Sequence, residues 1–195
     1  MPCLTFLLYE KKMKIQFYGQ NCFEVSTKDA SLVFDPNSKF SHDDLDFATD
    51  SGGFREGIQK IKNVKKTLSL PGEFEISGVL VRGFLSHPKN TVYKVFLEGF
   101  SLVHFGTLQQ MPSDEFLKQI GENDVLFFSL HDKFGPKSAK EVIEKLDPRF
   151  AFIGGDEKLF PKMGELGAKV SAENPFSFTD KEFHEEKMDI LILSV

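Results

Sequence analysis

The chain has no tryptophan, three tyrosines and two cysteines among its 195 residues. Cys3 and Cys22 form no Cys-x-x-Cys pair, which excludes a disulfide framework and a zinc knuckle. Long apolar runs are also missing. The run from Pro2 to Tyr9 is too short to span a bilayer, and basic residues follow it instead of preceding it as in a signal peptide. We therefore expect a cytoplasmic protein without membrane association.

Histidine is scarce, and its spacing excludes the commonest zinc motifs. The five histidines are His42, His87, His104, His131 and His184. None is close enough to another to form His-x-His or His-x-x-x-x-His, the spacings that bring two imidazoles onto one ion. Gly-x-Ser-x-Gly and Walker motifs are absent as well, and Cys22 lies in an apolar run where a thiol is usually inert.

The charge balance argues against a nucleic-acid partner. The chain carries 24 Lys and Arg against 29 Asp and Glu, for a net charge of −5. Phosphate affinity comes from clustered cations, and the modest patch of Lys60, Lys62, Lys65 and Lys66 is typical of a solvated face. Phenylalanine is abundant, with 22 residues. A core packed with Phe is the expectation, and a stacking platform for bases is the alternative that the charge disfavours.

The first half of the chain predicts short β-strands. Lys14–Tyr18, Cys22–Ser26 and Ser31–Asp35 show rough period-two alternation, and Pro36 ends the third. A polar stretch from Asn37 to Gly57 predicts a loop. A short helix is predicted over Arg55–Lys62. Strands are predicted over Thr67–Leu70, Glu73–Ile76, Val79–Phe84, Thr91–Leu97 and Phe100–Phe105. Ser77-Gly78 and Glu98-Gly99 predict tight hairpin turns between neighbouring strands.

The second half alternates strands and helices. Ser113 caps a predicted helix that ends at Ile120. A second helix is predicted over Ser138–Leu146, with Ser138 and Glu141 as a capping box. The remaining predictions are strands over Asp124–Leu130, Phe150–Ile153, Ala168–Ser171 and Asp189–Val195 and a short helix over Leu159–Leu166. This order suits two packed sheets with helices outside.

Several motifs, in order, resemble the metallo-β-lactamase superfamily, in its small Zn-dependent hydrolase branch. The matching segments are Gly19-Gln20-Asn21-Cys22-Phe23, Asp35-Pro36, Pro71–Val79, Asn90-Thr91-Val92-Tyr93 and Val103–Leu108. The resemblance covers about nine-tenths of the chain. It implies an α/β (α+β) fold: an αββα sandwich of two mixed β-sheets with outer helices. We expect residues 13–195 to form this single domain and residues 1–12 to be an N-terminal extension.

The resemblance implies a zinc-dependent hydrolase, but the metal-ligand motif is degenerate. Gln20 stands where the branch usually has His, and Asp46–Phe54 stands where it has His-x-His-x-Asp-His. Thr107 replaces the bridging Asp, and the last His would fall within Ile153–Asp156, which contains none. We therefore expect no catalytic residues of the family type and no cofactor. Zinc bound by an atypical set remains the alternative.

The remaining polar residues near the expected pocket are candidate site residues: Asp35, Asp50, Ser51, His87, Thr107, His131 and Asp156. His87 lies near the third His of the family and is, with Asp156, a weak metal-ligand candidate; Asp50 and His131 would complete a set of four. Each residue also has a structural interpretation. Asp35 and Asp156 suit strand ends and turns, His104 a partly buried strand position, and Ser51-Gly52-Gly53 either a turn or a small anion nest.

Two functional hypotheses follow, and loss of ligands at several positions together favours the first. The protein is a non-catalytic homologue, a pseudoenzyme, that acts as a binding or scaffold module for a small molecule or a protein. Alternatively, it is a metal-dependent hydrolase with an atypical metal site or with ligands supplied by a partner. A homo-oligomer formed through exposed Phe residues is left open.

Overall fold

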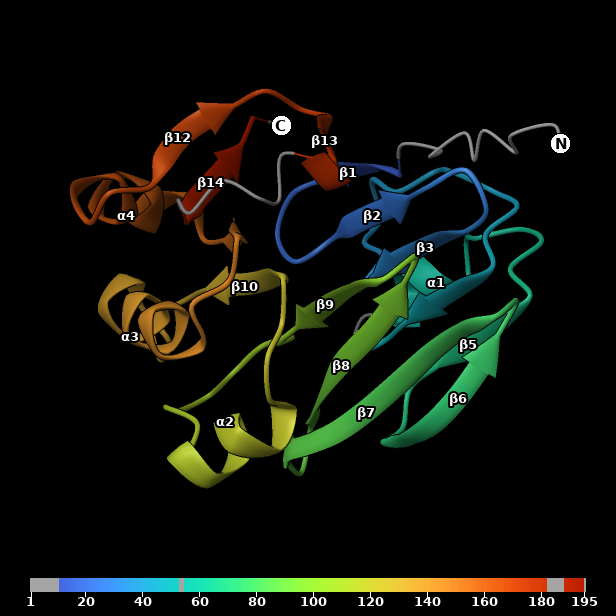
Figure 1. The fold of residues 1–195 in the computed structure, drawn as a ribbon, viewed down its shortest axis with the longest axis horizontal. Helices are drawn as coiled ribbons and strands as arrows, with labels where there is room; N and C mark the ends of the chain where they lie inside the picture. The colour runs from blue at the N-terminus through green and yellow to red at the C-terminus, as the bar shows by residue number, and fades with distance from the viewer. Residues whose placement is uncertain (1–10, 53–54, 182–187, 195) are drawn as a thin grey trace, which may run out of the picture.

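The computed structural model describes residues 11–52, 55–181 and 188–194, with the side chains of residues 55 and 56 left aside. Two β-sheets pack face to face (Figure 1). Helices lie on the outside of both sheets, so the predicted αββα sandwich is confirmed. Among the described residues, no helix is long and apolar enough to cross a membrane.

The first sheet, sheet A, has six strands in the order β13-β1-β2-β3-β4-β5. Its β1, β2, β3 and β13 pair antiparallel, whereas β3, β4 and β5 run parallel. The strands are β1 (Lys12–Phe17), β2 (Phe23–Ser26), β3 (Ser31–Phe34), β4 (Phe47–Thr49), β5 (Lys66–Leu68) and β13 (Phe176–Thr179).

The second sheet, sheet B, has eight strands in the order β12-β14-β11-β10-β9-β8-β7-β6. The strands from β6 to β9 form an antiparallel meander. The pairs β9-β10, β10-β11, β11-β14 and β14-β12 are parallel. The strands are β6 (Gly72–Ile76), β7 (Val79–His87), β8 (Asn90–Leu97), β9 (Phe100–His104), β10 (Val125–Leu130), β11 (Phe150–Gly155), β12 (Lys169–Ala172) and β14 (Asp189–Leu193).

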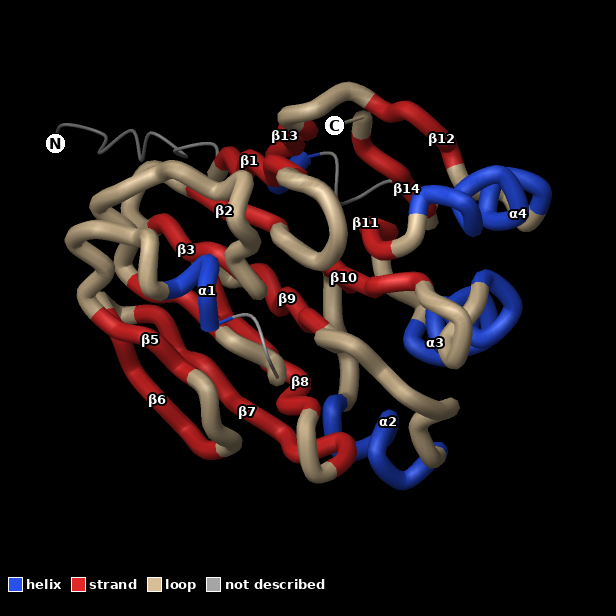
Figure 2. Tube along the Cα trace, turned by 180° about the vertical axis from the view of Figure 1, so that it is seen from behind, coloured by secondary structure: helices blue, strands red, loops and turns tan. Residues whose placement is uncertain are grey.

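The helices are short and lie outside the sandwich. Figure 2 shows α1 over sheet A, apart from α2, α3 and α4, whose apolar residues pack on the outer face of sheet B. They are α1 (Arg55–Ile58), α2 (Asp114–Ile120), α3 (Pro136–Leu146) and α4 (Phe160–Glu165), with a 3-10 turn, η1 (Glu157–Leu159), before the last.

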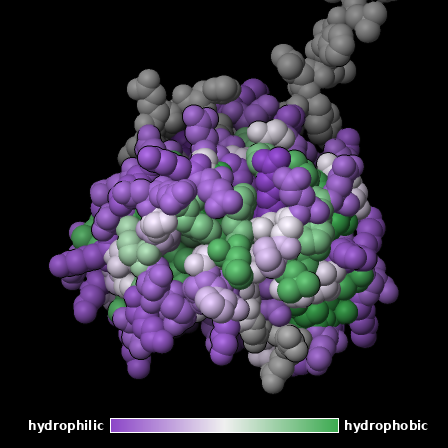
Figure 3. All heavy atoms as spheres, turned by 90° about the horizontal axis from the view of Figure 1, so that it is seen from below, coloured by the Kyte–Doolittle hydropathy of each residue, from purple (hydrophilic) through white to green (hydrophobic). Residues whose placement is uncertain are grey.

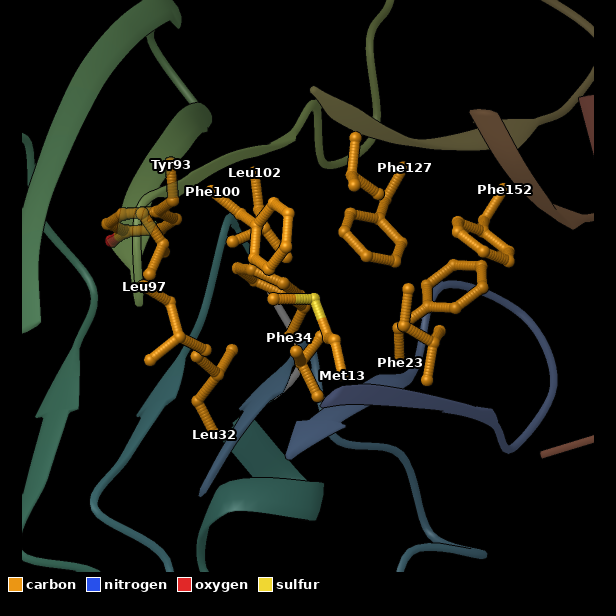
Figure 4. Close-up of a cluster of buried hydrophobic side chains, with 14 of the residues drawn as sticks. Met13, Phe23, Leu32, Phe34, Tyr93, Leu97, Phe100, Leu102, Phe127 and Phe152 are labelled. Carbon is orange, nitrogen blue, oxygen red and sulfur yellow. The ribbon is translucent and has the colours of Figure 1, made fainter. Parts of the chain in front are cut away.

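Phenylalanine fills the space between the sheets, as predicted. Figure 4 shows Phe127 and Phe152 of sheet B pointing toward Phe23 and Phe34 of sheet A. The ring centroid of Phe127 lies 5.0 Å from that of Phe23 and 5.2 Å from that of Phe34. These distances are typical of favourable aromatic pairs. These Phe residues therefore serve packing between the sheets.

Local signals explain most element boundaries. The turns at Ser77-Gly78 and Glu98-Gly99 have positive φ at both central residues, as the predicted hairpins require. Ser113 caps α2, and its hydroxyl accepts a hydrogen bond from the Phe116 amide at 3.2 Å. Both predictions are confirmed.

Three predictions of local structure are wrong. The predicted loop Asn37–Gly57 contains β4, which lies between β3 and β5 and is buried at all three residues, so no alternation marks it. The predicted capping box of α3 does not form. The helix begins two residues earlier at Pro136, whose fixed φ suits a first helical turn, after the N-cap residue Gly135. The predicted helix from Arg55 to Lys62 ends at Ile58.

Candidate functional site

The candidate site lies at one end of the sandwich, where chain segments leave parallel strands of both sheets. Asp35 follows β3, and Asp50 follows its parallel neighbour β4, so both carboxyl groups emerge at the same edge of sheet A. Ligand sites in sheets with parallel strands commonly form at such carboxyl ends. We call this region the crevice edge and define it by residues 19–21, 35–37, 50–52, 87–91, 104–107, 130–132 and 154–156.

Asp35 is the centre of a closed hydrogen-bond network. Its side chain is fully buried, and its backbone has a positive φ of 45°. The Ser51 amide donates to Oδ1 at 2.6 Å, and the Ser51 hydroxyl donates to Oδ2. The Asn21 side-chain amide donates to Oδ2 at 2.5 Å. These hydrogen bonds fix the position of the buried Asp35 carboxyl group.

His104 extends this network into sheet B. Its Nε2 lies 3.1 Å from the Asn21 side-chain oxygen and 3.9 Å from Asp35 Oδ2, and its ring stacks on Phe34 with centroids 4.7 Å apart. The neutral imidazole donates this bond, because a carbonyl oxygen only accepts. His104 is fully buried, so the expectation of a partly buried residue is wrong. Its Nδ1 has no hydrogen-bond partner within the described ranges.

Burial shifts both titrating groups toward their neutral forms. Burial raises the pKa of Asp35 to about 7, although the hydrogen bonds from Ser51 and Asn21 oppose the shift. Burial also lowers the pKa of His104 to about 3. In each case desolvation penalises the charged form. A neutral acid beside a neutral imidazole is thus the state that the site favours in mildly acidic solution.

Asn90 joins two loops of sheet B at the crevice edge. Its side-chain nitrogen donates to Ser86 Oγ at 2.8 Å and to the Phe105 carbonyl at 2.9 Å. Its side-chain oxygen accepts from the Thr107 amide at 2.7 Å. Asn90 is buried, and these bonds fix the segment after β9 against the turn between β7 and β8.

Backbone hydrogen bonds then tie sheet A to sheet B. The Thr91 amide donates to the Ser51 carbonyl at 2.7 Å, and the Gly155 amide donates to the Gln20 carbonyl at 2.5 Å. These two bonds hold the two sheets together at the crevice edge.

Glycines permit this close approach. A Cβ at Gly52 would lie 1.9 Å from the Lys89 carbonyl oxygen, and a Cβ at Gly106 would lie 2.6 Å from Ser51 Oγ. Contacts below 3.0 Å do not occur for real Cβ atoms. Gly52 belongs to the segment where the resemblance places the His-x-His motif. A ligating side chain at this position therefore has no room in the present fold.

The predicted site residues fall into three groups. Asp35, Asp50 and Ser51 lie together, with the Gly52 amide donating to Asp50 Oδ1 at 3.1 Å. The anion nest considered for Ser51-Gly52 is thus occupied by the protein's own carboxyl groups. His87 and Thr107 form a second pair, in which His87 Nε2 lies 3.4 Å from the Thr107 carbonyl oxygen.

The third group is His131 and Asp156, which follow the parallel neighbours β10 and β11. The Asp156 amide donates to the Leu130 carbonyl at 2.8 Å, which holds the two segments side by side. Asp156 is exposed, and its carboxylate caps η1 by accepting from the Lys158 amide at 3.1 Å. His131 Nδ1 lies 3.4 Å from Asp132 Oδ1.

These residues do not fit a zinc site. Across residues 11–52, 55–181 and 188–194, no three His, Cys, Asp or Glu side chains converge as metal ligands would. His87 instead faces a carbonyl oxygen and lines a separate cavity of about 230 Å³ with Met111 and Phe116. His184 lies outside the described residues.

Two asparagines are the functional positions that sequence reasoning missed. Asn21 links Asp35 to His104, and Asn90 links the loops of sheet B. Both lie in segments that carry the resemblance, the Gly-Gln-Asn-Cys-Phe and Asn-Thr-Val-Tyr runs. Their position in these motifs was the sequence feature that could have indicated them. Their hydrogen-bond partners could not be predicted, because these lie up to 83 residues away along the chain.

An open pocket of about 450 Å³ is lined largely by residues of the crevice edge. Its floor is polar, with Asp50, Ser51 and Thr91, and its rim carries Leu70 and Leu85, which are 68% and 56% exposed. Figure 3, which views the molecule from below, shows apolar patches among hydrophilic side chains on that face. A volume of this size suits a small-molecule ligand.

Comparisons with known proteins agree on the fold. The profile described as the β-lactamase superfamily domain matches residues 14–152. No curated protein sequence matches the chain. A protein described as a Zn-dependent hydrolase of the metallo-β-lactamase superfamily, from Thermotoga maritima, superposes with a TM-score of 0.80 at 22% identity, covering 93% of this chain and 98% of that chain.

Two further structures are similar over most of their length. A protein described as a metal-dependent hydrolase, from Parabacteroides distasonis, has a TM-score of 0.67 at 15% identity and covers 94% of each chain. The metallo hydrolase Igni18 from Ignicoccus hospitalis has a TM-score of 0.60 at 14% identity, over 86% of this chain and 98% of that chain. At these identities the likeness establishes a shared fold.

Proposed function

The chain belongs to the metallo-β-lactamase superfamily, and we propose that within it the protein is a non-catalytic homologue that acts as a binding or scaffold module. Its fold is that of metal-dependent hydrolases. The proposal rests on the arrangement of side chains and backbone at the crevice edge.

One observation carries the proposal: among the described residues, no three His, Cys, Asp or Glu side chains come together as metal ligands would. Asp35 receives three hydrogen bonds from Ser51 and Asn21. Gly52 has no space for a side chain against Lys89. A hydrolytic zinc site needs several deprotonated ligands and an open coordination position. The described residues of the crevice edge bring no such set of ligands together.

The open pocket beside Asp50 is the proposed binding surface. Lys89 and Thr91 offer polar contacts, whereas Leu70 and Leu85 offer exposed apolar area. A few polar groups among apolar ones are typical of sites for small organic ligands or for short segments of a partner protein. We place the ligand-binding function of the module here.

One feature favours the alternative of a hydrolase with an atypical metal site. Nε2 of His131 is buried and has no hydrogen-bond partner within the described ranges. An imidazole nitrogen of this kind is a suitable ligand. A lone nitrogen does not hold zinc, however, and Asp156 beside it is engaged in capping η1.

Thermal melting with added metal separates the two functions. The tag-free protein is melted alone and with micromolar Zn²⁺, Mn²⁺ or Fe²⁺. We expect an unchanged melting temperature, because only a ligand that binds the folded state stabilises it. A rise of several degrees that is lost in His131→Ala or His87→Ala would contradict the proposal and support the hydrolase.

A fluorescent probe tests the binding surface. The anionic aromatic dye 8-anilinonaphthalene-1-sulfonate matches a pocket with Leu70, Leu85 and Lys89. We expect the double variant Leu70→Ser/Leu85→Ser to lose most of the fluorescence gain. Val170→Ser is the matched control, because Val170 is also exposed, at 45%, but lies on β12. An equal loss in the control would contradict the assignment.

A further inference from the structure

A second cavity, of about 560 Å³, lies beside β1 of sheet A and the turn between β8 and β9, and shares no lining residue with the pocket at the crevice edge. Four lysines line it: Lys11, Lys12, Lys14 and Lys28. They come from β1, from the residue before it and from the turn between β2 and β3. In Figure 1 this part of the sheet lies far from α2 and α3, the helices that pack on sheet B. The cavity therefore belongs to neither function discussed above.

Strand pairing explains why cations and hydroxyl groups meet here. Met13 and Ile15 are buried between the sheets, so Lys14 points to the outer face by alternation. Directly opposite Lys14 stand Ser26 on β2 and Ser177 on β13. Residues opposite one another on adjacent strands share a face and approach closely. A lysine flanked by two serines thus forms a row across three strands.

The lining has a surplus of positive charge, although the chain as a whole is acidic. Against the four lysines stand two carboxylates, those of Asp29 and Glu98. The Lys11 ammonium donates to the Glu98 backbone carbonyl at 2.6 Å, which holds it at the cavity wall. The Thr27 hydroxyl also lines the cavity but donates to the Ala30 carbonyl, so the hydroxyl donors are those of Ser26 and Ser177. Clustered ammonium groups with hydroxyl donors attract an anion of high charge density.

We propose that this cavity binds a small molecule that carries two or more linked phosphate groups. Lysine is a compact point charge that serves as a phosphate ligand, and charge-assisted hydrogen bonds to phosphate oxygens are strong. Several lysines spread along the cavity suit an extended oligophosphate better than a single phosphate. The volume lies within the range typical of small-molecule sites.

Calorimetric titration of the full chain with sodium tripolyphosphate at low salt tests the proposal. We expect saturable binding in wild type and an affinity lower by about tenfold or more in Lys12→Gln/Lys14→Gln. Ser177→Ala, which changes no charge, should weaken binding by a smaller factor. Lys60→Gln/Lys62→Gln is the matched control, because it removes the same charge from exposed positions elsewhere and should bind as wild type does.

Three results would overturn the proposal. The first is absence of binding to wild type, whose melting temperature confirms a folded sample. The second is an equal loss of affinity in the site variant and the control, which would indicate general electrostatic attraction. The third is tighter binding of a single-stranded oligonucleotide than of tripolyphosphate, with the same dependence on Lys12 and Lys14, which would assign the surface to nucleic acid instead.

Discussion

Asp35 and His104 are two buried ionisable residues whose responses to pH oppose each other. Burial raises the pKa of Asp35 to about 7 and lowers that of His104 to about 3. Between roughly pH 4 and 6.5 the unfolded chain carries the proton on His104, whereas the folded chain carries it on Asp35. Both states hold the same number of protons on this pair. Its contribution to the free energy of unfolding is therefore nearly independent of pH in this window.

Asp35→Asn should expose the contribution of His104 alone. The unfolded state then takes up a proton below about pH 6.5 that the folded state refuses until about pH 3, so the free energy of unfolding falls by about 1.4 kcal/mol per pH unit as the pH drops. His104→Gln should show the opposite slope, with stability falling as the pH rises from about 4 to about 7. Urea unfolding across this range measures both slopes. Parallel profiles in wild type and both variants would contradict the assignment.

Gly52 should tolerate no side chain. Its φ of 155° and the Lys89 carbonyl oxygen, 1.9 Å from a Cβ, oppose even alanine. We expect Gly52→Ala to lower the free energy of unfolding by about 3 kcal/mol or more. Gly78→Ala is the control, because Gly78 also has a positive φ but open space around it, and should cost about 1 kcal/mol. Equal costs in denaturant melts would show that the close approach at Gly52 does not exist.

At the scale of elements, the crevice edge depends on loops that follow strands. Asn90 begins β8 and ties the segment after β9 to the turn before it. Asn90→Ala would leave the Phe105 carbonyl and the Thr107 amide without their partner. Leaving buried polar groups unpaired costs about 1–3 kcal/mol each, so we expect a loss of about 2–4 kcal/mol in denaturant melts.

Asn123→Ala provides the comparison for Asn90→Ala. Asn123 is also buried, but its side-chain nitrogen makes a single hydrogen bond, to the Gly121 carbonyl at 2.9 Å. We expect a loss of about 1 kcal/mol. A similar loss of the free energy of unfolding in both variants would mean that the hydrogen bonds of Asn90 stabilise the fold no more than the bond of Asn123 does.

Long strands with alternating apolar residues and clear turn residues could be predicted from the sequence, whereas short strands without them could not. Strands with alternation and paired turn residues, such as β7 and β8, were predicted to within a few residues. Two short strands, β4 and β13, were not predicted. The three residues of β4 are buried on both faces and lie in a polar stretch, whereas β13 has four residues after Pro175. Tertiary pairing, not local pattern, places them.

For the molecule as a whole, the order of weak motifs was enough to predict the αββα sandwich, because each motif marks a turn or strand end of that fold. Loss of the histidine motif could also be recognised from the sequence. The backbone hydrogen bonds that join the two sheets at the crevice edge could not. They link Thr91 to Ser51 and Gly155 to Gln20, which are far apart in sequence and meet only when the sheets pack.

Metal analysis of purified protein tests the central claim most directly. Tag-free protein prepared without chelator is dialysed against micromolar Zn²⁺ and then against metal-free buffer, and its metal content is measured by mass spectrometry. Because no three His, Cys, Asp or Glu side chains of the described residues converge and Gly52 leaves no room for a ligand, we predict zinc far below one equivalent per chain. Retention of one or two equivalents, lost on substitution of His87 or His131, would contradict the account.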